Sequence, residues 1–288
     1  MPSPEMRELI GELRRRHAAP TLAQARAAFT PSVRHHPVPA DVRVTAAVPG
    51  YWLDPPGADQ HRVLLYIHGG GYTNGSLHSH GELAARLGRA AGMRVLFSEY
   101  RLAPEHPYPA ALDDVRAAWR WLRHDEGVPA ATVALAGDSA GAALAVALLT
   151  TLRDAGEDQP AAAALLSPHV DLTATGPSVT THAADDATLT PDALRGIAAA
   201  YLAGTDPRTP LASPLFADLA GLPPLLILAG TAEILLSDAQ RLAAAARSAG
   251  VDVTLREGEG LPHAYPIMLG TPEAAEATTQ IGAFLRAH

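Results

Sequence analysis

The chain has 288 residues, a formal net charge of −8, 48% apolar residues and 18% charged residues. This composition is typical of one large α/β domain or two small ones with a substantial core, and the negative charge gives no electrostatic footprint for nucleic acid. Cysteine is absent and all 22 basic residues are arginine, which excludes disulfides, thiol nucleophiles, cysteine-based metal sites and a lysine Schiff base.

The sequence carries no targeting or membrane-spanning signal. No run approaches the ~20 apolar residues of a membrane span, and the N-terminal residues lack the apolar segment of a signal peptide. We therefore expect a cytoplasmic protein.

Short apolar runs alternate with helical patterns along the chain. The predicted strands are 42–48, 63–67, 95–100, 133–136, 161–166, 225–229 and 251–255. The predicted helices are 4–29, 81–91, 112–123, 142–152, 192–202, 234–249 and 273–285. Such alternation predicts a parallel sheet covered by helices on both faces.

Two segments do not follow this alternation: the N-terminal helix and the threonine-rich, proline-punctuated range 168–213. We expect both to lie over the carboxyl ends of the strands as a cap. The predicted organisation is one domain over 1–288, with a cap from 1–40 and 168–213 and a core from 41–167 and 214–288.

The sequence Gly137-Asp-Ser139-Ala-Gly141 joins a buried strand to an alanine-rich helix. It matches G-x-S-x-G, the nucleophile elbow, in which a strand turns so tightly into a helix that only small residues fit beside the serine. The turn leaves Ser139 at a helix N-terminus, where free N–H groups favour a developing negative charge. Ser139 is the predicted nucleophile.

A serine nucleophile needs a base and an acid that orients the base. His263 follows the last predicted strand, and no other histidine after Ser139 has such a place. Glu233 follows the strand 225–229 before the next helix begins, whereas Asp238 should lie in the first turn of that helix, where an acid stabilises the dipole. We favour Glu233 as the acid, with Asp238 as the alternative.

The oxyanion of a tetrahedral intermediate needs N–H donors. Ala140 follows the nucleophile, and Gly70 and Gly71 follow the strand 63–67 in the sequence His68-Gly-Gly-Gly-Tyr72. Glycine there lets the backbone approach the substrate closely. A phosphate-binding loop is the alternative, but the run lacks the spacing of nucleotide loops.

These motifs, with Tyr100-Arg-Leu-Ala-Pro-Glu-His106 between them, resemble the hormone-sensitive-lipase family of α/β-hydrolases. Within it, Ser167-Pro-His-Val-Asp171-Leu and Glu233-Ile-Leu-Leu-Ser-Asp238 look closest to bacterial carboxylesterases and monoterpene ε-lactone hydrolases. The resemblance covers residues from about 40 to the end. Where many members have an Asp-Pro-Leu motif, this chain has Glu233-Ile-Leu, which leaves Glu233 and Asp238 both open.

The resemblance implies an α/β-hydrolase fold with a mostly parallel eight-stranded sheet and a helical cap. It also implies a Ser139–Glu233–His263 triad, an oxyanion hole of Gly70, Gly71 and Ala140, and a homodimer in many members. The expected activity is hydrolysis of short-acyl esters through an acyl-enzyme, without metal or cofactor.

Two alternatives remain beside a short-acyl esterase. The same site could take a lactone or an N-acetyl amide. A non-catalytic receptor for a small molecule is the other, because the plant gibberellin receptors resemble this family but lack the catalytic histidine. The expected walls of the substrate pocket are Tyr72, His169, Tyr201 and Leu202.

Overall fold

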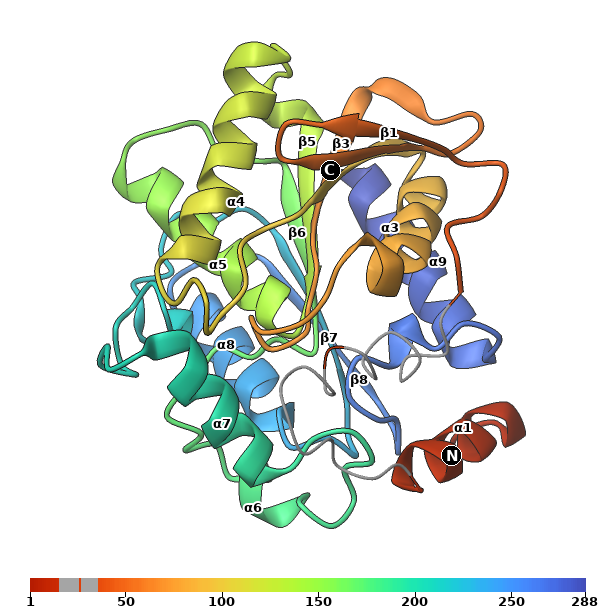
Figure 1. The fold of residues 1–288 in the computed structure, drawn as a ribbon, viewed down its shortest axis with the longest axis vertical. Coiled ribbons are helices and arrows are strands. Elements are labelled where there is room, and N and C mark those ends of the chain that lie inside the picture. Colours follow the sequence, from red (N-terminus) through yellow and green to blue (C-terminus); the bar gives the residue numbers. More distant parts are fainter. Residues whose placement is uncertain (16–25, 27–35) are drawn as a thin grey trace.

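The structure, a computed structural model, describes residues 1–15, 26 and 36–288. The strands are β1 (Arg43–Ala47), β2 (Gly50–Asp54), β3 (Asp59–Ile67), β4 (Met93–Ser98), β5 (Val133–Asp138), β6 (Ala162–Leu166), β7 (Leu225–Gly230) and β8 (Val253–Gly258). They form an eight-stranded sheet in the order β1-β2-β4-β3-β5-β6-β7-β8 (Figure 1). β2 pairs antiparallel with β1 and β4, and every pairing from β4 to β8 is parallel. The predicted α/β-hydrolase sheet is confirmed.

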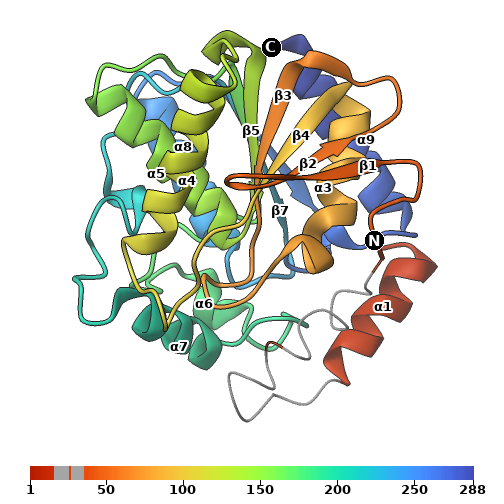
Figure 2. The same ribbon diagram turned by 45° about the horizontal axis from the view of Figure 1, so that its top comes forward.

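Helices cover both faces of the sheet. They are α1 (Pro4–Arg14), α3 (Leu77–Ala91), α4 (Ala110–Arg120), α5 (Ala140–Asp154), α6 (Ser178–Thr181), α7 (Pro191–Leu202), α8 (Leu236–Ser248) and α9 (Pro272–Ala287). Figure 2 shows α4, α5 and α8 on one side of the sheet and α3 with α9 on the other. α4 runs on as a short π-helix, Trp121–Asp125.

The core consists of two apolar layers, one on each face of the sheet. In β3, Val63, Leu65 and Ile67 pack in the layer with α4, α5 and α8, while Leu64 and Tyr66 pack in the layer with α3 and α9. This alternation is the period of two of a strand whose faces are both buried. Burial of each large apolar side chain stabilises the fold by about 1.5–3 kcal/mol, so the sheet is a rigid base for the loops at its carboxyl edge.

The segment predicted as the cap carries α6 and α7, which lie at one end of the sheet in both views. α7 begins with Thr190, whose side chain accepts the N–H of Ala193, and with Pro191 in its first turn, a favourable N-terminus for a helix. A Cβ atom on Gly71 would lie 2.8 Å from the side chain of Ile197, so α7 covers the loop after β3. The division into cap and core stays a prediction.

The N-terminal segment contacts both the predicted core and the predicted cap range 168–213. Ser3 caps α1 and bonds Glu273 at the start of α9, and Arg14 donates to the carbonyl of Asp185 at 3.0 Å. Arg26 donates to the carbonyl of Thr73 at 2.8 Å. Residues 16–25 and 27–35 lie outside the described residues, so the predicted helix 4–29 can be followed only over α1.

Among the described strands and α-helices, two were not predicted, β2 and α6. β2 is held by pairing with the distant β4, and Gly50 approaches the carbonyl of Phe97 so closely that a Cβ atom would overlap it. Such a strand depends on its partner more than on its own pattern. α6 is a four-residue turn, too short to show helical periodicity. In the part of the chain that the structure describes, no helix is long and apolar enough to cross a membrane.

Candidate active site

Ser139 lies in the turn between β5 and α5 with φ 52° and ψ −117°. For a residue other than glycine this backbone conformation is strained, and residues strained in this way cluster at functional sites. A Cβ atom on Gly141 would overlap the carbonyl of Ile67, and one on Gly137 would lie 2.6 Å from the backbone of Gly141. The steric reason predicted for both glycines is therefore present.

Glu233 and His263 come together from the loops after β7 and β8. Nδ1 of His263 lies 3.3 Å from Oε2 of Glu233, and Glu233 is completely buried. The hydroxyl of Ser167 donates to the same Oε2 at 2.8 Å and accepts the N–H of Ala264 at 2.9 Å. Ser167 therefore links the acid to the residue that follows the histidine.

The electrostatics of this pair favour a protonated imidazole. Burial lowers the pKa of His263, but the contact with the Glu233 carboxylate outweighs it, and Asp186 and Asp138 add to the rise, so the pKa lies above 6.5. Oε1 of Glu233 has no hydrogen-bond partner among the described residues. A buried carboxylate with few other hydrogen-bond donors strongly favours a positive charge beside it. It would therefore stabilise the imidazolium that forms when His263 takes up a proton.

Asp238 lies elsewhere. Its Oδ2 accepts the N–H groups of Val170 and Asp171, both at 3.0 Å, and its Oδ1 accepts from Arg241 at 2.9 Å. It is in the first turn of α8, as expected, and ties the loop after β6 to that helix. The structure thus brings Glu233 to His263, whereas Asp238 anchors a loop.

The glycines after β3 have backbones that only glycine adopts readily, φ 111° for Gly70 and φ 61° for Gly71. Ala140, the other expected donor, is the first residue of α5. The N–H of Gly69, one residue earlier in this loop, is held by Asp138, the residue before the nucleophile, at 3.0 Å.

Asp138 is the centre of a buried network. It also accepts the hydroxyl of Tyr66 at 2.7 Å and lies 3.3 Å from Nε2 of His80. Burial raises the pKa of Asp138, but the contacts with His80 and the Tyr66 hydroxyl lower it by more. The net result is a pKa of about 2. A fixed anion therefore links the glycine loop to the nucleophile elbow.

Three of the predicted pocket residues lie together. The Tyr72 and Tyr201 rings stack with centroids 3.7 Å apart, and the His169 ring lies 6.5 Å from Tyr72. The backbone N–H of His169 donates to the carbonyl of Ser139 at 3.2 Å. Leu202 is buried in the same apolar layer as both tyrosines.

Three further residues that contact the site, Ser167, Asp138 and Asp186, were not predicted from the sequence. The available signal was position: Ser167 directly follows β6 and Asp138 directly precedes the nucleophile. Asp186 had no such signal. It lies in the predicted cap segment and reaches the loop of Glu233 only in three dimensions, accepting the N–H of Ile234 at 2.8 Å.

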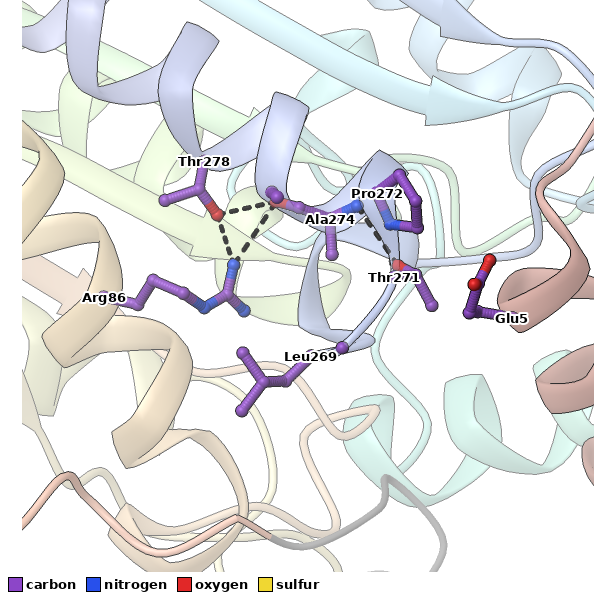
Figure 3. Close-up of a pocket in the computed structure, with 9 residues that line it drawn as sticks. Glu5, Arg86, Leu269, Thr271, Pro272, Ala274 and Thr278 are labelled. Atoms are coloured by element: carbon purple, nitrogen blue, oxygen red, sulfur yellow. Dashed lines mark hydrogen bonds between the residues drawn. The ribbon is translucent and has the colours of Figure 1, made fainter.

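A separate pocket of about 550 Å³ lies between α1, α3 and α9 (Figure 3). Arg86 in its wall donates to the hydroxyl of Thr278, to the carbonyl of Pro266 and to the carboxylate of Glu82. Its guanidinium is thus engaged within the protein, and none of the predicted site residues lines this pocket.

Comparison with known proteins decides the family. Residues 64–267 match the model of an α/β-hydrolase fold family. The crystal structure of an esterase from the bacterial hormone-sensitive lipase family superposes with a TM-score of 0.95 at 43% identity, covering 100% of this chain and 99% of that one. The chain belongs to the hormone-sensitive-lipase family of α/β-hydrolases.

Curated relatives of this hydrolase have related names. An acetyl-hydrolase of Streptomyces hygroscopicus is 48% identical over 252 residues, which are 86% of this chain and 83% of the relative. An esterase of Acinetobacter venetianus is 37% identical over 229 residues, 79% and 75% of the two chains. The resemblance predicted from the motifs is confirmed.

Proposed function

We propose that this hydrolase is a serine carboxylesterase that cleaves short-acyl esters through an acyl-enzyme, with Ser139, His263 and Glu233 as its triad. That it is a carboxylic ester hydrolase follows from its family and from relatives named as esterases. The observation that carries the triad is the 3.3 Å contact between Nδ1 of His263 and Oε2 of Glu233. The two loops that bear this pair and the strained elbow of Ser139 all leave the carboxyl ends of parallel strands.

The proposed mechanism has two half-reactions, and in each of them His263 acts first as a base and then as an acid. Nε2 of His263 takes the proton of the Ser139 hydroxyl as its oxygen attacks the ester carbonyl, and Glu233 stabilises the resulting imidazolium. N–H groups of Gly70, Gly71 and Ala140 bind the oxyanion. The intermediate collapses, the C–O bond to the alcohol breaks, and His263 protonates the leaving oxygen. Water then attacks the acyl-enzyme by the same steps, which releases the acid and restores Ser139.

The preference for short acyl groups is supported by the bulk beside the glycine loop. Ile197 packs over Gly71, and the stacked rings of Tyr72 and Tyr201 are each only 1% exposed. Large, rigid side chains in these places leave little room for a long acyl chain.

The test is turnover of p-nitrophenyl acetate, butyrate, octanoate and decanoate by the wild type and by Ser139→Ala. We expect kcat/KM to fall from butyrate to decanoate and the variant to lose about 10⁴-fold or more, as for other triad serines. A Ser139→Ala variant with normal turnover would refute the mechanism. Undiminished turnover of decanoate would refute the short-acyl preference alone.

A second candidate is removal of an acetyl group from an amide, favoured by the 48% identity to a protein named acetyl-hydrolase. Amines leave less readily than alcohols, so this activity should show as a measurable rate on p-nitroacetanilide beside p-nitrophenyl acetate. An ester-specific enzyme would leave the anilide intact.

A further inference from the structure

We propose that His169 determines substrate specificity in this esterase, by hydrogen-bonding a polar atom of the substrate a few bonds from the scissile carbonyl. The inference rests on the proposed function, since it concerns the same site. It names a substrate class: esters with an ether, hydroxyl or amide group near the ester bond.

His169 is placed among groups of the proposed reaction centre. The backbone N–H of His169 donates to the carbonyl of Ser139 at 3.2 Å. The centroid of its ring lies 6.5 Å from that of Tyr72, the residue after Gly71. Its imidazole also lies close enough to His263 for that charge to lower its pKa. The backbone of His169 is therefore tied to Ser139, and its imidazole lies beside the Tyr72 ring and within electrostatic reach of His263.

One ring nitrogen of His169, Nε2, is buried with no hydrogen-bond partner in the described part of the chain. His169 is 1% exposed, and its Nε2 bonds to none of the residues that the structure describes. A buried polar atom without a partner lowers the stability of the protein, and each such atom calls for an explanation. A substrate atom that bonds Nε2 would remove this cost when it binds.

The pKa values of the two histidines are shifted in opposite directions, which suits them to different roles. Burial, together with His263, lowers the pKa of His169 to about 4, so its imidazole is neutral near pH 7. A neutral imidazole offers Nε2 as donor or acceptor without competing as a base. His263, with Glu233 beside it and a raised pKa, is suited to proton transfer.

Two other buried polar atoms help to judge this one. Nε2 of His68 also lacks a partner in the described ranges, but its ring is stacked on Tyr100 at 4.2 Å and its Nδ1 lies 2.8 Å from the carbonyl of Gly69, which gives it a structural role. The hydroxyl of Tyr201 lacks a described partner as well, and its ring stacks on Tyr72. A second unsatisfied group beside Tyr72 agrees with a polar substrate at this place.

The experiment compares esters that differ by one CH₂-to-oxygen replacement. The acyl pair is p-nitrophenyl methoxyacetate and p-nitrophenyl butyrate, and the alcohol pair is 2-methoxyethyl acetate and butyl acetate. For each pair the ratio of kcat/KM, polar to apolar, is measured in the wild type, His169→Phe and His169→Gln. Taking ratios within one protein cancels a general loss of activity.

We expect the wild-type ratio, corrected for hydroxide-catalysed hydrolysis of the same esters, to exceed unity by about tenfold in one pair, the size of a hydrogen bond gained at a buried group. His169→Phe should lose this excess and His169→Gln, which keeps an N–H donor, should retain most of it. The pair that responds tells whether the polar atom belongs to the acyl or the alcohol part. His61→Phe, a matched change at an exposed residue of β3, should leave both ratios unchanged.

A corrected wild-type ratio near unity in both pairs overturns the proposal, and needs no variant to fold. An equal loss of the excess in the Phe and Gln variants also overturns it, because it indicates a packing role. In either case hydrolysis of butyrate that depends on Ser139 would leave the proposed esterase intact, so the two failures are distinguishable.

Discussion

Glu233 and Asp238 are five residues apart, yet their carboxylates contact different groups. We expect Glu233→Gln to lower kcat/KM by about 10³- to 10⁴-fold, as when other triad acids lose their charge. Asp238→Asn should lower stability but leave activity within about tenfold, because Asp238 contacts backbone and Arg241 rather than His263. Steady-state kinetics normalised by active-site titration measure both, and the reverse order would make Asp238 the acid.

The pH dependence follows from the sign of the His263 shift. The base must be neutral to accept the proton of Ser139, so activity is lost as the pH falls through the folded-state pKa. Since Glu233 holds that pKa above 6.5, the acidic limb of kcat/KM should have its midpoint above 6.5. In Glu233→Gln the midpoint of the residual activity should move down. A wild-type midpoint below 6.5 in a profile from pH 5 to 9 would contradict the pairing.

We propose that Ser167 positions the Glu233 carboxylate. Ser167→Ala removes the hydroxyl that holds Oε2 of Glu233 and the N–H of Ala264, so kcat should fall about 10- to 100-fold with little change in KM, since a misplaced catalytic group affects the transition state most. Ser98→Ala is the control, because the hydroxyl of Ser98 is buried without a described partner and its loss should be nearly neutral. Equal effects of the two changes would mean that Ser167 only fills space.

At the level of elements, the site depends on how β3, β5 and α3 meet. Asp138 on β5 fixes the loop after β3 through Gly69 and contacts His80 on α3. Asp138→Asn should lower the free energy of unfolding by about 3–5 kcal/mol, the usual cost of breaking a buried charge pair, and reduce kcat as the oxyanion donors shift. Asp154→Asn, which alters an exposed ion pair with Arg153, should cost under about 1 kcal/mol. Urea denaturation with parallel kinetics tests both, and similar small costs would refute the linking role.

At the level of the whole molecule, Arg241 joins core and predicted cap. It bonds the buried carboxylates of Asp171 and Asp238, each at 2.9 Å. Arg241→Met would leave two buried carboxylates close together, so we expect a loss of about 3–5 kcal/mol in urea denaturation. Arg195→Met, which removes an exposed pair with Asp192, should cost less than about 1 kcal/mol. A comparable effect of both would show that the buried cluster contributes little.

The loss in Arg241→Met should also depend on pH. Burial raises the pKa of Asp238 to about 7, although Arg241 opposes the rise. Without the arginine the folded state should hold this proton more tightly still. Above pH 3.8 both folded proteins bind more protons than their unfolded chains, so both should lose stability as the pH rises towards 7. Above about 7 only the variant should go on losing stability, so the cost of Arg241→Met should grow there.

Sequence alone determined the elements whose signals are local. The buried runs of β3, β5 and β7 alternate with helices, and the spacing of Gly137 and Gly141 around Ser139 has a steric cause that needs no partner elsewhere. His263 could be placed because loops after parallel strands share one edge of a sheet. These features follow from the chain's own periodicity and from the small number of ways in which such units pack.

The tertiary structure decided what depends on distant residues. β2 forms because β4 lies beside it. The proposal of Glu233 rather than Asp238 as the acid rests on the 3.3 Å between Nδ1 of His263 and Oε2 of Glu233. Ser167, Asp138 and Asp186 act through partners 66, 69 and 48 residues away. Charge and hydrogen bonding in a buried site depend on position in space, which a local pattern does not contain.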